Sequence, residues 1–186
     1  MVLCKIKSKT MKKLIFPVAI LAILVSSAYT TFTAANWKIG KGYAIKFTSK
    51  NPEGVFTSLT GDVSFDEKNL AASKFDVTVD AASISTGNGI KNKHAKSDKW
   101  FDVKQYPSIK FTSSKISKTA KGYEATGILD LHGVKKEIKM PFSFANNTFN
   151  SSFEINRLDY KVGTNQGMSA NAATTLKIDL SVPVTK

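Results

Sequence analysis

Much of this chain alternates apolar and polar residues with a period of two. Phe75, Val77 and Val79 occupy every second position of the segment 74–80, and lysine, aspartate and threonine fill the positions between them. Leucine, isoleucine and valine alternate with polar residues in the same way over 175–184. Successive side chains of a β-strand point to opposite faces, so each segment has one apolar face. The pattern predicts antiparallel strands around a shared apolar interior.

Short turn-forming sequences separate these segments, and Gly61-Asp62 is one of the expected turns. The predicted strands are 43–49, 55–60, 62–65, 74–80, 108–117, 122–132, 134–144, 148–157 and 175–184. Because most gaps are short, neighbours in the sequence are expected to pair antiparallel as a meander. About eight strands enclose an interior just wide enough for one ligand. The sequence therefore predicts an all-β fold, an antiparallel up-and-down β-barrel of about eight strands.

The alternation stops between residues 81 and 107, where the spacing of apolar residues becomes helical. Positions i, i+4, i+7 and i+11 form one stripe of a helix. Here they are Ile90, His94, Ser97 and Phe101. We expect a short helix near residues 89–98 that caps one end of the barrel. A second irregular segment, 159–173, is rich in Gly, Asn and Ala and predicts a long loop, of a length that is often functional.

The first 35 residues predict export. Two lysines precede an apolar run over 14–25, and small residues follow it, an order typical of a secretory signal peptide. The run is shorter than the ~20 residues that a membrane-spanning helix needs, so a retained anchor is the less favoured alternative. Cleavage after Ala28 or after Ala35 is compatible with the sequence. We expect one domain, 36–186, located in the periplasm or secreted.

Cysteine content and charge narrow the classes of function. The single cysteine, Cys4, precedes the apolar run, so no disulfide and no thiolate nucleophile is expected after cleavage. Removal of the signal peptide takes five lysines and no acids, which lowers the formal net charge from +13 to +8. The densest basic cluster falls on the predicted helix, at Lys91, Lys93, Lys96 and Lys99. A basic chain attracts anions such as phosphates, lipid headgroups or nucleic acid.

Residues that carry catalysis do not form a recognisable set. The two histidines, His94 and His132, lack companions at metal-ligand spacing. A G-x-S-x-G serine motif and a glycine-rich phosphate loop are both missing. The acidic residues of the predicted strands fall at positions that point outward, away from the apolar interior. We therefore expect no enzyme activity, no metal site and no cofactor. A hydrolase or isomerase that acts on a bound lipid is an alternative without a supporting residue set.

The apolar phase of the strands is compatible with a solid core or with a cavity. Small residues interrupt it at Ala125, Gly127 and Ser151, which leaves room for a guest. A filled barrel also has little use for a helical cap. The residues by themselves leave both interpretations open.

Several motifs occur in order along the chain. They are G-D-V-S-F-D at 61–66, A-S-I-S-T-G-N at 82–88, His94, W-F-D-V at 100–103, Y-P-S-I-K-F at 106–111, G-I-L-D-L-H-G-V-K-K at 127–136 and F-E-I-N-R-L-D-Y at 153–160. Together they resemble the signature of the YceI-like family over residues 36–186. The chain departs from that pattern in its first strand and in the loop 161–173, which lacks the acidic pair that often precedes the last strand.

The resemblance implies an exported bacterial, lipocalin-like barrel that holds an isoprenoid chain for transport, storage or sequestration. The chain would belong to a polyprenyl phosphate or an isoprenoid quinone. The expected lipid contacts are Phe47, Phe65, Phe75, Val77, Phe101, Phe111, Leu129, Leu131, Met140, Phe142, Phe153 and Ile155. We expect the headgroup near Lys91, His94 and Arg157, and transient contact with an anionic membrane surface.

A basic barrel that binds nucleic acid or another anion, without a lipid cavity, is the alternative. Binding of single-stranded nucleic acid needs exposed aromatic residues on a basic face. Most phenylalanines of this chain lie on the inward phase, and export would separate the protein from nucleic acid. No nucleic-acid partner is therefore expected.

Overall fold

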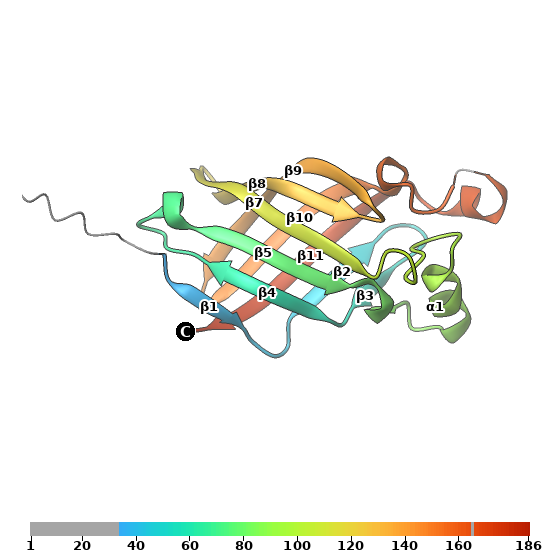
Figure 1. The fold of residues 1–186 in the computed structure, drawn as a ribbon, viewed down its shortest axis with the longest axis horizontal. Coiled ribbons are helices and arrows are strands. Elements are labelled where there is room, and N and C mark those ends of the chain that lie inside the picture. Colours follow the sequence, from blue (N-terminus) through green and yellow to red (C-terminus); the bar gives the residue numbers. More distant parts are fainter. Residues whose placement is uncertain (1–33, 165) are drawn as a thin grey trace, which may run out of the picture. The chain divides into compact units, whose positions relative to one another are not determined.

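The computed structural model describes residues 34–164 and 166–186, and positions 1–33 of the predicted signal peptide lie outside this range. The described part is mostly β-strand (Figure 1). Its strands are β1 (Asn36–Ile39), β2 (Ala44–Thr48), β3 (Gly54–Phe56), β4 (Leu59–Ser64), β5 (Lys74–Asp80), β6 (Ile84–Ser85), β7 (Ser108–Thr119), β8 (Gly122–Leu131), β9 (Val134–Ala145), β10 (Thr148–Asn156) and β11 (Thr175–Thr185).

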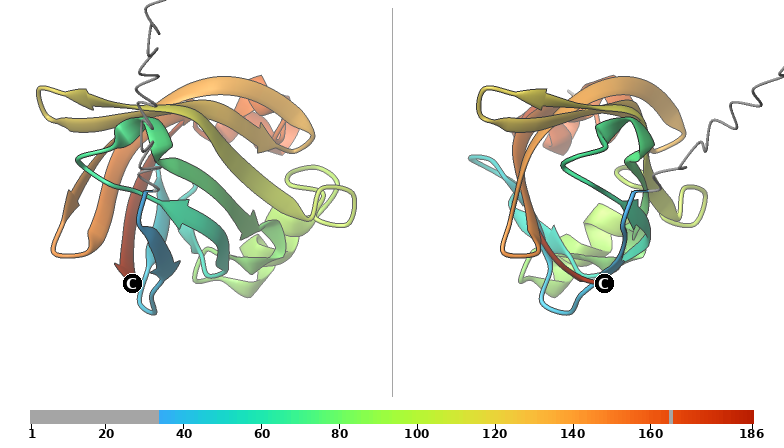
Figure 2. Two further views of the ribbon diagram at one scale, coloured as in Figure 1. Left: turned by 60° about the vertical axis from the view of Figure 1, so that its left-hand side comes forward. Right: turned by 90° about the vertical axis from the view of Figure 1, so that its left-hand side faces the viewer.

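Within the described residues, eight of these strands close into an antiparallel barrel, which confirms the predicted fold class (Figure 2). The ring runs β1-β4-β5-β7-β8-β9-β10-β11. It closes because β11 also pairs with β1, at Lys38–Thr185 and Ile39–Val184. Strands β2, β3 and β6 continue the sheet from β11 as a side branch. Most neighbours in the ring are also neighbours in the sequence, so the barrel is an up-and-down meander.

The predicted turn at Gly61-Asp62 is wrong. Strand β4 runs through both residues, and Gly61 pairs with Val77 of β5. Gly61 has a φ of +127°, and a Cβ there would collide with the backbone of Asp76. The glycine therefore serves a close approach between two strands.

Two of the three small inward residues serve packing between strands. Gly127 on β8 faces a β-bulge of β7 between Ser113 and Lys115. A Cβ at Gly127 would lie 2.6 Å from the Cα of Ser113. Ala125 is fully buried and does not line the cavity described below. Of the three small residues that were expected to make room for a guest, only Ser151 lines the cavity.

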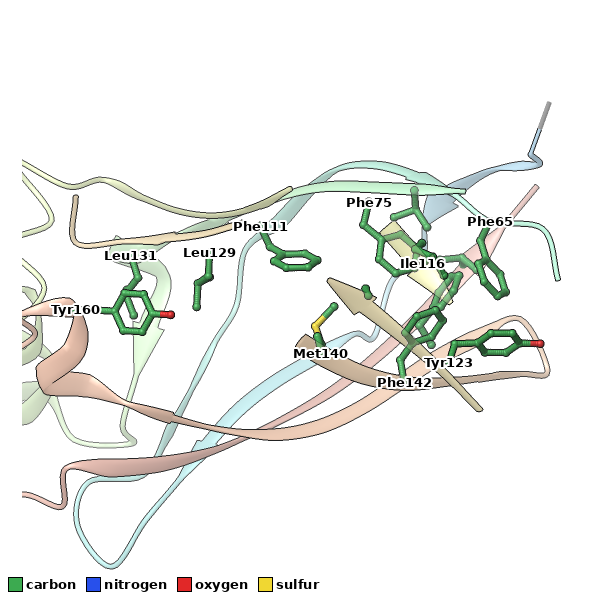
Figure 3. Packing of buried hydrophobic residues seen from close by; sticks show 14 of the residues in the cluster. Phe65, Phe75, Phe111, Ile116, Tyr123, Leu129, Leu131, Met140, Phe142 and Tyr160 are labelled. Atoms are coloured by element: carbon green, nitrogen blue, oxygen red, sulfur yellow. The ribbon is translucent and has the colours of Figure 1, made fainter. Parts of the chain in front are cut away.

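Aromatic rings close one end of the barrel (Figure 3). Phe65 is 1% exposed, and its ring centroid lies 5.1 Å from that of Tyr123 and 5.4 Å from that of Phe149. Phe75 and Phe142 join the same cluster, with centroids 5.3 Å apart. Most of these pairs meet edge to face, a geometry that aromatic quadrupoles favour. We call these five residues the aromatic plug.

Irregular segments gather at the opposite end of the barrel. They are the 3₁₀ turn η2 (Ala81–Ser83), the helix α1 (Gly89–Lys96), and the 3₁₀ turns η3 (Arg157–Tyr160) and η4 (Gly167–Asn171). Helix α1 begins after Asn88, whose side chain accepts a hydrogen bond from Lys91 N at 3.0 Å. Its position confirms the predicted helix. Among the described residues, no helix is long and apolar enough to span a bilayer.

The two residues of the predicted apolar stripe that lie within α1 do not face the barrel, whereas Phe101, after the helix, lines the cavity described below. Ile90 is 72% exposed, and His94 is exposed beside it. The opposite face points inward: Asn92 Oδ1 accepts hydrogen bonds from Thr86 N at 2.7 Å and Thr86 Oγ1 at 2.8 Å. Ala95 packs against the small cluster around Phe47. These contacts, which no periodicity reveals, orient the helix.

Candidate functional site

The interior of the barrel holds an apolar cavity of about 190 Å³. Of the 28 described residues that line it, 25 are apolar, and the exceptions are Lys46, Ser151 and Arg157. All eight strands of the ring except β1 contribute at least two of these side chains; β1 contributes only Ile39. The wall therefore offers a ligand hydrocarbon contact along nearly its whole surface.

The inward side chains do not fill the space inside the barrel. Val77, Ile109, Ile138 and Phe153 all point into the cavity, yet each is only partly buried. Because these side chains point inward, their exposed surface faces open space inside the barrel. The interior is therefore a lined cavity over part of its length and a solid core only at the aromatic plug.

The cavity is elongated. On β11 the lining residues run from Leu176 to Val182, which are six residues apart. At about 3.3 Å per residue this is about 20 Å along the strand, or roughly 15 Å along a barrel axis to which strands tilt by 35–45°. Figure 3 shows labelled core side chains spread along the same direction, from Tyr160 and Leu131 to Phe65 and Tyr123. The shape fits a chain-like molecule better than a compact one.

Eleven of the twelve predicted lipid-contacting residues line this cavity. They are Phe47, Phe75, Val77, Phe101, Phe111, Leu129, Leu131, Met140, Phe142, Phe153 and Ile155. The twelfth, Phe65, lies outside the lining, in the centre of the aromatic plug. Sequence reasoning missed Val162, which lines the cavity from the irregular segment after β10, where no strand alternation marks an inward position.

Arg157 is the charged residue most deeply placed in the wall, with 1% of its surface exposed. Its guanidinium donates to five backbone carbonyls of the following segment. The bonds run from Nε to Ala173 (2.9 Å), from Nη1 to Val162 (2.9 Å), and from Nη2 to Thr164 (3.1 Å), Ser169 (3.0 Å) and Ala172 (3.2 Å). Burial lowers the pKa of Arg157, although an arginine stays protonated in proteins. The side chain therefore organises residues 162–173 around one buried positive charge.

Trp100 connects this segment to the region of α1. The guanidinium carbon of Arg157 lies 5.1 Å from the centroid of the Trp100 ring, a cation–π distance. The next residue, Phe101, lines the cavity and packs edge to face on Phe56 with centroids 5.7 Å apart. The two irregular segments thus meet at the end of the cavity that lies away from the aromatic plug.

The structure separates the three predicted headgroup residues. Arg157 reaches the cavity, whereas Lys91 and His94 lie on the exposed face of α1 and do not line it. Their role at a headgroup stays a prediction.

Groups that support chemistry are sparse at the cavity. Across residues 34–164 and 166–186, no cluster of three or more His, Cys, Asp or Glu side chains could hold a metal ion. His132 lies in the β8–β9 turn with a φ of +54° and packs on Tyr106, with ring centroids 4.4 Å apart. Both of its ring nitrogens are buried without a hydrogen-bond partner in the part of the chain that the structure describes, and it does not line the cavity.

Curated relatives with similar sequences come from several bacteria. A UPF0312 protein of Enterobacter sp. (strain 638) is 27% identical over 192 residues, which cover 94% of this chain and 96% of the relative. A UPF0312 protein of Photorhabdus laumondii is 39% identical over 85 residues, 46% of this chain and 44% of the relative. For this and similar matches, the aligned stretch spans less than half of the relative's length.

Solved structures share the fold. BcnA of Burkholderia cenocepacia superposes with a TM-score of 0.71 at 30% identity, covering 77% of this chain and 96% of BcnA. The YCEI protein of Campylobacter jejuni gives a TM-score of 0.62 at 25% identity and covers 75% and 88%. A polyisoprenoid binding domain from Saccharophagus degradans gives 0.57 at 17% identity and covers 81% and 97%, a likeness of fold. The model of the YceI-like domain matches residues 22–184, and the chain therefore belongs to the YceI-like family.

Proposed function

We propose that this protein is exported to the periplasm and holds an isoprenoid chain, of a polyprenyl phosphate or an isoprenoid quinone, inside its barrel. The observation that carries the proposal is the elongated cavity with 25 apolar lining residues and an aromatic plug at one end. The hydrocarbon tail would lie along the cavity with its end toward the plug. The protein would then carry, store or sequester the lipid.

The energetics of an apolar wall suit such a ligand. Each methylene that leaves water contributes about 0.8 kcal/mol, so a long tail reaches high affinity without a specific polar contact. The wall holds few polar groups that would select one tail over another. Selectivity would therefore depend on tail length and on the groups at the end near Arg157.

Arg157 supports an anionic headgroup at that end. Its Nη1 carries two hydrogens, and among the described residues one of them is used, for Val162 O. The positive charge has no carboxylate partner among the described ion pairs. A phosphate near the cavity end would be attracted by the positive charge of Arg157 and could accept a hydrogen bond from its second Nη1 hydrogen. The polyisoprenoid ligand class named for the Saccharophagus domain, which shares the fold, supports the same class here.

Native mass spectrometry of the protein purified from a bacterial periplasm tests the proposal. We expect a bound species whose mass matches an isoprenoid lipid and which organic solvent extracts. A protein that is recovered empty, and that stays empty when incubated with detergent-solubilised polyprenyl phosphate and with a quinone, would contradict the proposal.

A further inference from the structure

The outward face of α1 combines an exposed apolar residue with lysines. On the helix, Ile90, Lys91 and Lys93 are exposed, and Lys99 and Lys104 are exposed in the segment that follows. We call these five residues the basic rim. Ile90 is 72% exposed, more than the other large exposed apolar residue of the described chain, Ile128, at 41%. An isoleucine in this position is not explained by packing inside the barrel.

The basic rim carries charge that the fold does not neutralise. Between residues 87 and 107 the sequence has five lysines and two acids, Asp98 and Asp102. None of the ion pairs formed by the described residues includes a lysine of this segment. Helix α1 itself contains no acidic residue. The surface is therefore complementary to a negatively charged partner.

Rigid contacts hold the basic rim at one end of the cavity. Asn92 fixes the helix to Thr86, and Phe101 N donates to Ala95 O at 3.0 Å, which ties the helix to a residue of the cavity wall. The helix lies at the end of the barrel opposite the β7–β8 turn (Figures 1 and 2). A partner that binds the rim would lie next to that end of the cavity.

We propose that the basic rim docks this end of the barrel onto an anionic lipid bilayer. Lysines near a surface of anionic lipids are attracted to it, and an apolar side chain between them inserts at the boundary of headgroups and acyl chains. Ile90 favours a bilayer over nucleic acid, because a phosphate backbone offers no apolar contact to it. The docking places the cavity where a lipid leaves or re-enters the bilayer. A role of the docking in lipid transfer rests on the proposed function, whereas the docking itself does not.

Vesicle sedimentation tests the docking without any ligand in the cavity. We expect the protein to bind vesicles of phosphatidylglycerol and phosphatidylcholine, but not vesicles of phosphatidylcholine alone. Binding should fall steeply at about 1 M salt, where the Debye length is about 3 Å. Each lysine near an anionic surface is expected to contribute about fivefold, so K93Q/K99Q should lower the partition coefficient at least tenfold. I90Q should lower it several-fold further.

Matched controls remove the same groups elsewhere. K118Q/K121Q takes two exposed lysines from the opposite end of the barrel, and I128Q takes the other exposed isoleucine. Both controls should keep binding within about twofold. Equal losses in the rim and control variants, an I90Q variant that binds like the unchanged protein, or tighter binding to duplex DNA than to the vesicles would each overturn the proposal.

Two measurements on the same variants separate this inference from the proposed function. If the rim variants lose vesicle binding but still take up detergent-solubilised polyprenyl phosphate, the docking is supported and the cavity is unaffected. If the protein binds vesicles as expected but never takes up a lipid, the docking stands and the proposed function fails.

Discussion

The guanidinium of Arg157 lies over the ring of Trp100, 5.1 Å from its centroid, and Gly163 packs against both. A Cβ at Gly163 would lie 2.9 Å from Arg157 Nη1 and 3.0 Å from the Trp100 ring. Gly163 also has a φ of +67°, a conformation that glycine adopts without strain. These three residues join the segment after β10 to the segment after α1, so the end of the cavity depends on them.

Replacement of Arg157 by methionine should destabilise the protein strongly. The change removes five hydrogen bonds to carbonyls, and it leaves buried carbonyl oxygens without donors. Each hydrogen bond from a charged donor contributes about 1.5–3 kcal/mol, and the losses overlap, so we expect a loss of at least about 3 kcal/mol in the free energy of unfolding. Urea denaturation followed by tryptophan fluorescence measures it. K161M, which changes an exposed neighbour, should cost less than about 0.5 kcal/mol. Similar losses in both variants would contradict the role given to Arg157.

Gly127 should not tolerate a side chain. In G127A the new Cβ would lie 2.6 Å from Ser113 Cα and would collide with Thr112 O, both of them backbone atoms of β7. Overpacking of this kind costs about 1–3 kcal/mol, which thermal denaturation detects as a lower Tm. G89A is the matched control, because nothing lies within 4 Å of a Cβ there and its φ is not positive. We expect G89A to be neutral or slightly stabilising. An unchanged Tm in G127A would mean that the two strands separate easily at the bulge.

The alternation of residues was enough to predict the barrel. Strands such as β5 and β11 keep one apolar phase over their whole length, and a period-two pattern has one structural meaning when it persists this long. The closing strand β1 was not predicted. It has four residues, too few for alternation to stand out, and it is defined by its pairing with β4 and β11.

The wall of the cavity was also predictable from the sequence, whereas its end was not. Inward positions of strands follow from the period, so eleven expected contacts line the cavity. The direction of α1 depends on the hydrogen bonds between Asn92 and Thr86, and the surroundings of Arg157 depend on the path of residues 162–173. Both are tertiary contacts of irregular segments. The sequence therefore identified Arg157 as a candidate residue, but it did not show that most of its N–H groups donate hydrogen bonds to backbone carbonyls of the protein itself.

A larger side chain at Ser151 should block the cavity. Ser151 is the small residue of β10 that lines it, so S151F would place a ring in the space that we assign to the lipid tail. We expect uptake of a fluorescent isoprenoid analogue to fall at least tenfold while the barrel stays folded by circular dichroism. N150F adds the same ring to the neighbouring, outward position of β10 and should bind like the unchanged protein. Full uptake by S151F would show that the ligand does not occupy this part of the barrel.

The hydrogen bond from Tyr123 to Glu67, at 2.5 Å, should make the aromatic plug sensitive to alkaline pH. This hydrogen bond, followed by burial, raises the pKa of Tyr123 above its ordinary value. A phenol whose pKa is raised in the folded state binds its proton more tightly there than in the unfolded chain. Its contribution to stability is therefore complete below a pH of about 10 and declines as the pH rises above that value. Y123F removes the contribution, which we expect to be about 1.5 kcal/mol at neutral pH, the low end for a hydrogen bond to a charged group, because Glu67 is exposed.

Urea denaturation at neutral pH and above pH 10 measures this difference. We expect the gap in unfolding free energy between the unchanged protein and Y123F to narrow as the pH rises. E67Q keeps an acceptor for the hydroxyl but removes the negative charge, so its stability should depend less on pH in the same range. A gap that stays constant, or widens, above pH 10 would mean that Tyr123 loses its proton equally readily in the folded and unfolded chains, and that the carboxylate of Glu67 does not hold the hydroxyl in place.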